Sequence, residues 1–223
     1  MPAIIDDPTS APIPRFREPP TLSPKPIVLK DNTKATIIPF TSLTQPPASL
    51  VAYLCAQFAL IIEEGDTYPM LDPMPLSSFG PYWFANFTAV ALMGEFESVE
   101  DVRALGEEAD WSSICLGTFY IKSNYPGRSR HVCNAGFVTT PVSRNRGVGK
   151  LMGRTYLEWA PQLGYTYSVF NLVYETNVAS LKIWDSLGFE RIGRVKKCGE
   201  LKSYPGKKID AIIYGYDFEP DAK

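Results

Sequence analysis

The sequence predicts an α+β fold, in which a central mixed sheet is flanked by helices. Three observations support this prediction. Short β-rich segments recur along the chain, segments with apolar residues at helical spacing stand between them, and 223 residues suffice to bury a sizeable core. The first part of the chain lacks a core-forming pattern. We therefore expect one domain of residues 34–223, preceded by a proline-rich arm of residues 1–33.

The elements of the first half follow from local pattern. Alternation predicts strands, apolar residues on one face predict helices, and prolines mark where a helix can begin. An acidic segment is expected to be a solvated connection with room for a helical turn. In order, we expect a strand at residues 35–39, helices at 46–64 and 79–86, a strand at 88–96, the acidic connection at 97–110 and a strand at 114–121.

The second half shows clearer signals. A strand at residues 133–140 leads into a helix whose periodic apolar residues run from Val148 to Leu163, and Gly164 closes it. The remaining expected elements are a strand at residues 167–174, a helix at 178–187 and strands at 190–195 and 210–218.

The start of the chain does not look like a targeting segment. Residues 1–26 carry eight prolines and an acidic Asp6-Asp7 pair, unlike a secretory signal or a basic transit peptide. The arm is expected to run extended, either loose or laid across the domain surface. No apolar run is long enough to span a bilayer. We expect a cytoplasmic protein, with a mitochondrial fraction left open.

Charge and cysteines restrict the class of partner. The net charge is −2 and the basic residues are dispersed, so nucleic acid or an anionic membrane is not expected as the main partner. The four cysteines lack zinc-like spacing and mostly stand in apolar runs, so we expect reduced, buried thiols and no metal. They are Cys55, Cys115, Cys133 and Cys198.

The most informative stretch joins the strand at residues 133–140 to the next helix through a turn with two glycines. It reads Pro141-Val-Ser-Arg144-Asn-Arg-Gly147-Val-Gly149-Lys150. Such glycines let the backbone approach a pyrophosphate, and the unpaired N–H groups of a helix N-terminus supply donors. Positive charge also collects here, at Arg144, Arg146, Lys150 and Arg154. The turn therefore predicts a phosphate site.

Spacing excludes two familiar phosphate loops. A Walker loop needs a glycine where Arg144 stands and a Ser or Thr where Leu151 stands. A dinucleotide fingerprint needs its third glycine where Met152 stands.

The stretch instead resembles the coenzyme A loop of the GNAT superfamily of N-acetyltransferases, whose pattern is Pro-x-x-(Arg/Gln)-x-x-Gly-x-(Gly/Ala). This sequence fills every fixed position of that pattern. A second motif follows at GNAT spacing, with a small residue, an aromatic and a Gly-Phe pair after an asparagine: Asn177, Ser180, Trp184, Gly188 and Phe189. The resemblance implies a GNAT fold, with a mostly antiparallel twisted sheet, about four helices, and splayed fourth and fifth strands, here residues 133–140 and 167–174.

The resemblance also implies where the cosubstrate, acetyl-CoA, binds. Its pantetheine arm is expected between the splayed strands, with its amides on Phe137, Val138 and Thr139. The pyrophosphate is expected on the turn, at Arg144, Asn145, Arg146, Gly147, Val148, Gly149 and Lys150. Asn177, Ser180 and Trp184 are expected to contact the cosubstrate from the other wall.

Further blocks resemble the fungal L-azetidine-2-carboxylate N-acetyltransferases over residues 113–217. They are Gly117-Thr-Phe-Tyr-Ile-Lys122, Cys133-Asn-Ala-Gly-Phe137, Trp159-Ala-Pro161, Phe170-Asn-Leu-Val173, Lys182-Ile-Trp-Asp185 and Asp210-Ala-Ile-Ile-Tyr-Gly215, with Tyr68-Pro69 and Tyr82-Trp83-Phe84 upstream. This resemblance implies acetylation of the ring nitrogen of small cyclic imino acids, namely azetidine-2-carboxylate and cis-4-hydroxyproline, with proline-pathway metabolites as further candidates. It also implies a detoxification or stress-tolerance role and a homodimer.

Asparagines carry the substrate hypothesis. The family uses asparagines at the positions of Asn134 and Asn171, and an amide can address both the amine and the carboxylate of an imino acid. We expect these two as catalytic, substrate-orienting residues, with Leu172 also binding substrate. A structural alternative remains, since an asparagine in a strand often marks a bulge or an edge. Asn177 is expected to cap its helix in either case, besides serving the pantetheine.

The proton pathway is less clear from sequence. Attack requires a neutral ring nitrogen, so a base or a water chain must remove its proton. The only histidine, His131, follows two arginines in a polar loop and is expected at the surface, and Glu175 is a secondary candidate. Trp184 stands where many GNAT enzymes place a tyrosine acid, which leaves Tyr174, a water or no acid for the thiolate. We expect direct transfer in a ternary complex, driven by positioning and backbone N–H groups.

Two alternatives stay open. One is a GNAT acting on another amine, such as a polyamine, an antibiotic or a protein terminus, and the acidic residues 97–110 are compatible with a polyamine. The other is a non-catalytic acyl-CoA sensor. The aromatic residues near the C-terminus fit either a dimer interface or simple core: Tyr204, Tyr214, Tyr216 and Phe218.

Overall fold

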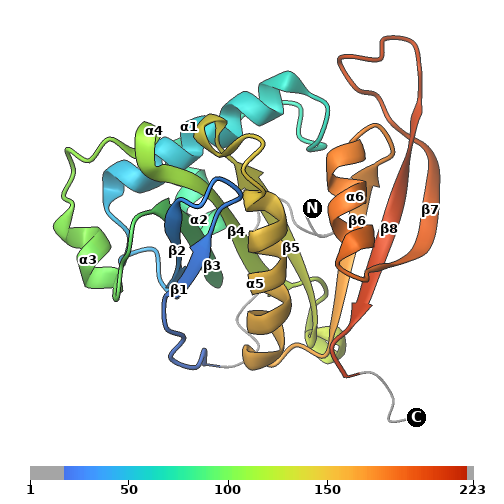
Figure 1. The fold of residues 1–223 in the computed structure, drawn as a ribbon. Coiled ribbons are helices and arrows are strands. Elements are labelled where there is room, and N and C mark those ends of the chain that lie inside the picture. Colours follow the sequence, from blue (N-terminus) through green and yellow to red (C-terminus); the bar gives the residue numbers. More distant parts are fainter. Residues whose placement is uncertain (1–17, 220–223) are drawn as a thin grey trace.

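Neighbouring residues on the central strands point to opposite faces of one sheet, and helices cover both faces (Figure 1). The structure, a computed structural model, describes residues 18–219. The strands are β1 (Lys25–Val28), β2 (Lys34–Phe40), β3 (Phe87–Met93), β4 (Cys115–Ser123), β5 (Val132–Thr139), β6 (Tyr167–Tyr174), β7 (Glu190–Gly199) and β8 (Ile209–Asp217). The helices are α1 (Ala48–Glu64), α2 (Leu76–Trp83), α3 (Val99–Ala104), α4 (Trp111–Ile114), α5 (Val148–Gln162) and α6 (Val178–Ser186).

The sheet is mixed and mostly antiparallel, with strand order β1-β2-β3-β4-β5-β6-β8-β7. β5 and β6 form its parallel pair, and they pair only at Val132 with Tyr167 and Cys133 with Ser168. Beyond these residues the two strands separate. The predicted α+β fold with splayed central strands is therefore confirmed.

Two apolar layers hold the helices on the sheet. On one face, Ile37, Phe119 and Ile121 pack with side chains of α5 and α6. On the other face, Ile38 and Tyr120 pack with side chains of α1 and α2. The alternation between neighbouring residues of one strand produces these layers.

The helix after the phosphate turn has the core face that its periodicity predicts. Its buried face includes Met152, Tyr156 and Trp159. Burying a side chain such as that of Met152 stabilises the fold by about 1.5–3 kcal/mol. Truncating Trp159 to alanine is expected to cost about 3–5 kcal/mol. This packing fixes the N-terminal end of α5 at the end of β5.

Several boundaries differ from the sequence-based expectations. β1 lies inside the segment expected to be an arm, and its prolines and single buried residue, Ile27, are typical of a short edge strand. α2 begins three residues earlier than expected and contains Pro81. The acidic connection contains α3, the helical turn for which it was expected to have room, capped by a box between Ser98 and Asp101, whereas α4 follows the connection and includes Ile114, which was expected to begin the next strand. β7 extends to Gly199.

The cysteines and the C-terminal aromatics can now be placed. All four cysteines are free, but Cys198 is exposed, because β7 is an edge strand, whereas burial was the expectation. Tyr214 is fully buried, and Tyr216 and Phe218 pack against the core layer that contains α5. Tyr214 is therefore a core residue, and Tyr216 and Phe218 are partly buried against the core. Among residues 18–219, no helix is long and apolar enough to cross a membrane. The acidic pair Asp6-Asp7 lies outside the described residues.

Candidate active site

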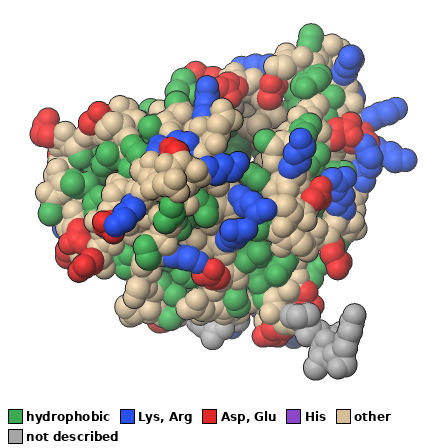
Figure 2. Space-filling view, in the orientation of Figure 1, with side chains coloured by type: hydrophobic (Ala, Val, Ile, Leu, Met, Phe, Trp, Pro, Cys, Tyr) green, Lys and Arg blue, Asp and Glu red, His purple; other side chains and the backbone are tan. Residues whose placement is uncertain are grey.

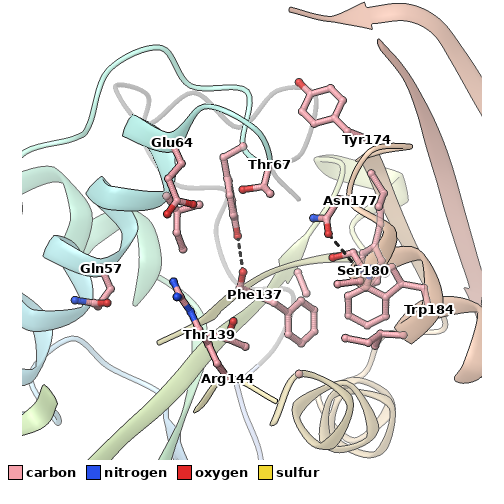
Figure 3. Close-up of a pocket in the computed structure, with 18 of the residues that line it drawn as sticks. Gln57, Glu64, Thr67, Phe137, Thr139, Arg144, Tyr174, Asn177, Ser180 and Trp184 are labelled. Atoms are coloured by element: carbon pink, nitrogen blue, oxygen red, sulfur yellow. Dashed lines mark hydrogen bonds between the residues drawn. The ribbon is translucent and has the colours of Figure 1, made fainter. Parts of the chain in front are cut away.

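A cavity of about 350 Å³ opens where β5 and β6 separate. Figure 3 shows its walls: Gln57, Glu64 and Thr67 lie on one side, and Tyr174, Asn177, Ser180 and Trp184 on the other, with Phe137, Thr139 and Arg144 between them. The first wall belongs to α1 and the loop after it, and the second to β6 and α6. Segments far apart in the sequence thus meet over the gap in the sheet.

The pairing of β5 with β4 decides which backbone groups of β5 face the cavity. The N–H of Thr140 donates to the carbonyl of Leu116 at 3.1 Å, and the N–H of Asn124 donates to the carbonyl of Val132 at 2.8 Å. Hydrogen-bonded pairs alternate along an antiparallel ladder, so Val138 also bonds to β4.

Phe137 and Thr139 therefore direct their backbone groups away from β4, into the gap. Both residues line the cavity, as an amide-pairing edge for pantetheine requires. Val138 does not share this arrangement, because its side chain is buried in the core and its backbone pairs with β4. The residues present fit coenzyme A through Phe137 and Thr139.

The phosphate turn leaves the start of α5 open. After a 3-10 turn at Pro141–Ser143, Asn145 and Gly147 adopt left-handed backbone angles, with φ of 61° and 80°. Gly147 tolerates this angle without strain because it lacks a Cβ. No side chain caps α5, and its first turn holds no acidic residue. Its N–H groups and dipole thus suit an anion.

The second glycine of the motif has a packing role. A Cβ at Gly149 would lie 3.0 Å from Cδ1 of Ile183 on α6. Gly149 also lines the cavity. It therefore lets α6 approach α5, which brings Asn177, Ser180 and Trp184 to the cavity wall.

The two arginines of the motif have different surroundings. Arg146 donates to the carboxylate of Asp31 at 2.7 Å, to the hydroxyl of Thr33 at 2.8 Å and to the carbonyl of Val142 at 3.3 Å. The hydrogen bond from Arg146 lowers the pKa of Asp31 to about 2. Arg146 thus ties the turn between β1 and β2 to the phosphate turn. Arg144 is exposed and lines the cavity.

Positive charge gathers near the cavity opening. Figure 2 shows Lys and Arg side chains over the N-terminal half of α5, beside a hollow in the surface. In the sequence, this region carries Arg144, Lys150 and Arg154. Asn145 is exposed at the same turn, whereas Val148 is buried and offers only its backbone.

The residues expected on the second wall lie together. The side-chain oxygen of Asn177 accepts from the backbone N–H of Ser180 at 3.2 Å, so the expected helix cap is confirmed. Both residues also line the cavity. Trp184 packs on Phe137, with ring centroids 4.9 Å apart, and on Phe170, with centroids 4.7 Å apart.

The expected substrate residues lie just beyond the last pair between β5 and β6, outside the set that lines the cavity. Asn134 and Asn171 are 0% and 8% exposed. Asn171 stands at a register shift of β6 between Phe170 and Val173, as an asparagine at a bulge would. Leu172, its neighbour, is half-buried and packs with Tyr174.

A third asparagine, Asn124, joins the other two. The side-chain amides of Asn134 and Asn171 donate to its Oδ1 at 3.0 Å and 2.6 Å, and its own Nδ2 donates to Oδ1 of Asn171 at 3.2 Å. Asn124 precedes Tyr-Pro-Gly in the sequence, a context typical of an ordinary turn residue. We call Asn124, Asn134 and Asn171 the asparagine cluster.

The candidates for proton transfer differ in whether they line the cavity. His131 is exposed, as expected, and Glu175 forms an ion pair with Arg194. Tyr174 lines the cavity, and burial raises its pKa, so its hydroxyl is protonated at neutral pH. Among the described residues that line the cavity, Glu64 carries the one carboxylate. Sequence pattern does not single out Glu64, because it ends an ordinary amphipathic helix.

Comparisons with known proteins agree with this geometry. The profile of the acetyltransferase (GNAT) family matches residues 76–189. The chain is 40% identical over 157 residues to N-acetyltransferase aca1 of Schizosaccharomyces pombe, which covers 70% of this chain and 75% of that protein.

Solved structures share the fold. A GCN5-related N-acetyltransferase from Kribbella flavida superposes with a TM-score of 0.64 at 23% identity, covering 81% of this chain and 97% of that one. YncA from Salmonella typhimurium, solved with its cofactor acetyl-CoA, superposes with a TM-score of 0.62 at 13% identity, covering 85% and 96%. The chain belongs to the GNAT family of acetyltransferases and is an acetyl-CoA-dependent N-acetyltransferase.

Proposed function

We propose that this enzyme acetylates the ring nitrogen of small cyclic imino acids, with L-azetidine-2-carboxylate and cis-4-hydroxyproline as the first candidates. The observation that carries the proposal is the buried asparagine cluster beside the cosubstrate cavity. An amide offers a donor and an acceptor, and an imino acid has an N–H and a carboxylate to match them.

A buried cation near the cluster supports a substrate with a carboxylate. Lys122 pairs with Asn134 across β4 and β5 and is 6% exposed. Its ammonium lies 4.0 Å from the ring centroid of Tyr82 and 4.3 Å from that of Tyr120. Such a charge attracts the carboxylate of an amino acid and repels a polyamine.

The residues that line the cavity also favour an imino acid over a polyamine as the substrate. Its described lining contains one carboxylate, that of Glu64, and one guanidinium, that of Arg144. A polyamine site would be expected to be acidic. The acidic residues 97–110, which kept that alternative open, form α3 and its flanks, on the far side of α1 and β2 from α6 (Figure 1).

The proposed reaction is a direct transfer. The lone pair of the neutral ring nitrogen forms a bond to the carbonyl carbon of the acetyl group, the carbon–sulfur bond breaks, and the nitrogen loses its proton to a base. The thiolate that leaves has the pKa of an ordinary thiol, about 8.5, and needs little help. We propose that Tyr174, which lines the cavity, protonates it, and that the backbone of Phe137 and Thr139 holds the acyl donor in line.

The test measures thiol release from acetyl-CoA with azetidine-2-carboxylate, cis-4-hydroxyproline, proline, spermidine and a peptide amine offered separately. Turnover confined to the cyclic imino acids is the expected result. Asn134→Ala and Asn171→Ala should then lower kcat/KM for the imino acid by about 10- to 100-fold. Turnover only with spermidine or the peptide would overturn the substrate assignment.

A matched control separates site effects from stability. Thr88 is fully buried on β3, and its hydroxyl donates to the carbonyl of Trp83 at 2.7 Å. Thr88→Val removes a buried hydrogen bond away from the asparagine cluster and should leave kcat/KM within about twofold of the unmodified enzyme.

We also propose that the enzyme is a cytoplasmic homodimer with a role in tolerating toxic imino acids. This proposal rests on the resemblance to the fungal enzymes. Sedimentation velocity of the full chain tests the dimer, and a purely monomeric profile at micromolar concentration would contradict it.

A further inference from the structure

We propose that Asn124 is a positioning residue, which orients the amide of Asn134 so that its oxygen accepts a hydrogen bond from the substrate amine. The inference rests on the proposed function and deepens it, because it states which end of the substrate meets Asn134. It concerns a residue that neither the phosphate turn nor the lining of the cavity includes.

Asn124 is held rigidly. It is 0% exposed, directly follows β4, and its backbone N–H donates to the carbonyl of Val132 at 2.8 Å. This bond continues the ladder between β4 and β5, so the backbone of Asn124 is as fixed as that of the sheet.

With the amides of Asn134 and Asn171 oriented as they are in the structure, one orientation of the Asn124 amide satisfies its hydrogen bonds. Its Oδ1 accepts from Nδ2 of both Asn134 and Asn171, at 3.0 Å and 2.6 Å. Reversal of this amide alone would place its Nδ2 against two donors. Its Nδ2 meanwhile donates to Oδ1 of Asn171 at 3.2 Å, which fixes that amide as well.

The orientation of Asn134 follows from that of Asn124. If the Asn134 amide turned over, its oxygen would face Oδ1 of Asn124, and two acceptors would oppose each other. The Asn134 amide is therefore held with its nitrogen toward Asn124 and its oxygen directed elsewhere.

The side-chain oxygen of Asn134 provides the second observation that supports the proposal. Oδ1 of Asn134 is buried and has no hydrogen-bond partner among the described residues. An unpaired buried acceptor costs folding free energy, and such cost is commonly retained where a ligand supplies the partner. Asn134 shares a face of β5 with Val138, on the side of the sheet that α1 covers, and residues of α1 line the cavity.

An acceptor selects one end of an imino acid. It attracts an N–H and repels a carboxylate oxygen, so the geometry assigns the amine to Asn134 Oδ1. The carboxylate then belongs toward a donor, for which Lys122 provides the buried positive charge. Because the contact is to a neutral amide rather than a carboxylate, it binds the amine without stabilising its protonated form strongly.

A double-mutant cycle tests this inference on the full-length enzyme. Asn124→Ala and Asn134→Ala should each lower kcat/KM for the imino acid by about 10- to 100-fold, with KM for acetyl-CoA unchanged. Because Asn124 acts through Asn134, the double variant should fall no more than about threefold below Asn134→Ala. Losses that multiply in the double variant, or unmodified activity in Asn124→Ala, would overturn the inference.

A conservative variant distinguishes orientation from packing. A carboxylate at position 124 keeps both acceptor bonds to the neighbouring amides and loses one donor bond. Asn124→Asp should therefore recover at least about tenfold of the activity lost in Asn124→Ala. Thr88→Val serves as the control for a similar loss of thermal stability. If it remained active while Asn124→Ala and Asn124→Asp were equally impaired, the proposal that Asn124 orients Asn134 through its acceptor oxygen would be excluded.

Failure of the proposed function is recognised separately. If the unmodified enzyme acetylates no cyclic imino acid, the cycle is run with the amine that it does acetylate, because Asn134 Oδ1 would accept any amine N–H. If it acetylates none, the side-chain amide NMR signals of Asn134 and Asn171 decide. They should move in Asn124→Asp and stay in Thr88→Val, and unchanged signals in both variants would overturn the inference.

Discussion

The hydroxyl of Tyr68 donates a hydrogen bond to the backbone carbonyl oxygen of Phe137 at 3.1 Å, and both residues line the cavity. Tyr68 is buried, and burial raises its pKa well above its usual range, so the hydroxyl stays a donor throughout the physiological range. The carbonyl of Phe137 lies on the edge of β5 that faces the cavity. Tyr68 thus occupies an acceptor that an amide of coenzyme A can also use.

Removing this hydroxyl should tighten coenzyme A binding. In Tyr68→Phe the carbonyl loses its partner in the free protein, whereas the bound ligand replaces that partner. The free energy of unfolding should fall by about 1 kcal/mol, and the Kd for coenzyme A should fall about fivefold. Calorimetric titration and thermal unfolding check this, with Tyr204→Phe as the control. Weaker binding in Tyr68→Phe would mean that the hydroxyl contacts the ligand instead.

The two arginines of the phosphate turn should behave differently. Arg144→Gln removes a cation that lines the cavity, so the Kd for coenzyme A should rise by about 10- to 100-fold, while the Kd for pantetheine, which lacks phosphates, should hardly change. Arg146→Gln breaks the contact with Asp31 and Thr33 and should instead lower Tm by about 2–4 °C. Equal losses of coenzyme A affinity in both variants would contradict the distinction.

The pair between Arg146 and Asp31 should contribute to acid sensitivity. The pKa of Asp31 is lowered from 3.8 to about 2 in the folded protein, so its contribution is present above pH 4 and is lost as the pH falls toward 2. The effect is small because Asp31 is exposed to solvent. Asp31→Asn should lower Tm slightly at pH 7 and flatten the Tm profile between pH 4 and pH 2. A parallel profile would show that Asp31 is not the titrating group.

Glu64 carries the one carboxylate among the described residues that line the cavity, so we predict that it receives the proton of the ring nitrogen. Glu64→Gln should lower kcat/KM by about 100-fold at pH 7, and the deficit should shrink as the pH rises and the amine becomes neutral by itself. The pH profiles of Glu64→Gln and the unmodified enzyme test this. Glu63→Gln is a matched control, because the neighbouring Glu63 is exposed and does not line the cavity. A constant deficit at every pH would assign Glu64 a binding role.

The sequence by itself determined the parts of this enzyme that depend on neighbouring residues. The strand, turn and helix from residue 132 to residue 162 form from local pattern, and Asn177 caps α6 through a residue three positions away. Local hydrogen bonds and hydrophobic period leave a trace in contiguous sequence, and for that reason the fold class and the strand, turn and helix around the glycine motif could be predicted.

Only the tertiary structure decided the partners of polar groups that lie far apart in the sequence. Tyr68 reaches Phe137 over 69 positions, Asn124 reaches Asn171 over 47, and Arg146 reaches Asp31 over 115. Hydrogen bonds at such separations depend on how the strands are ordered in the sheet, and no local pattern records that order. Arg144 and Arg146 therefore look equivalent in the sequence, and the sheet distinguishes them by bringing the turn between β1 and β2 against Arg146 alone.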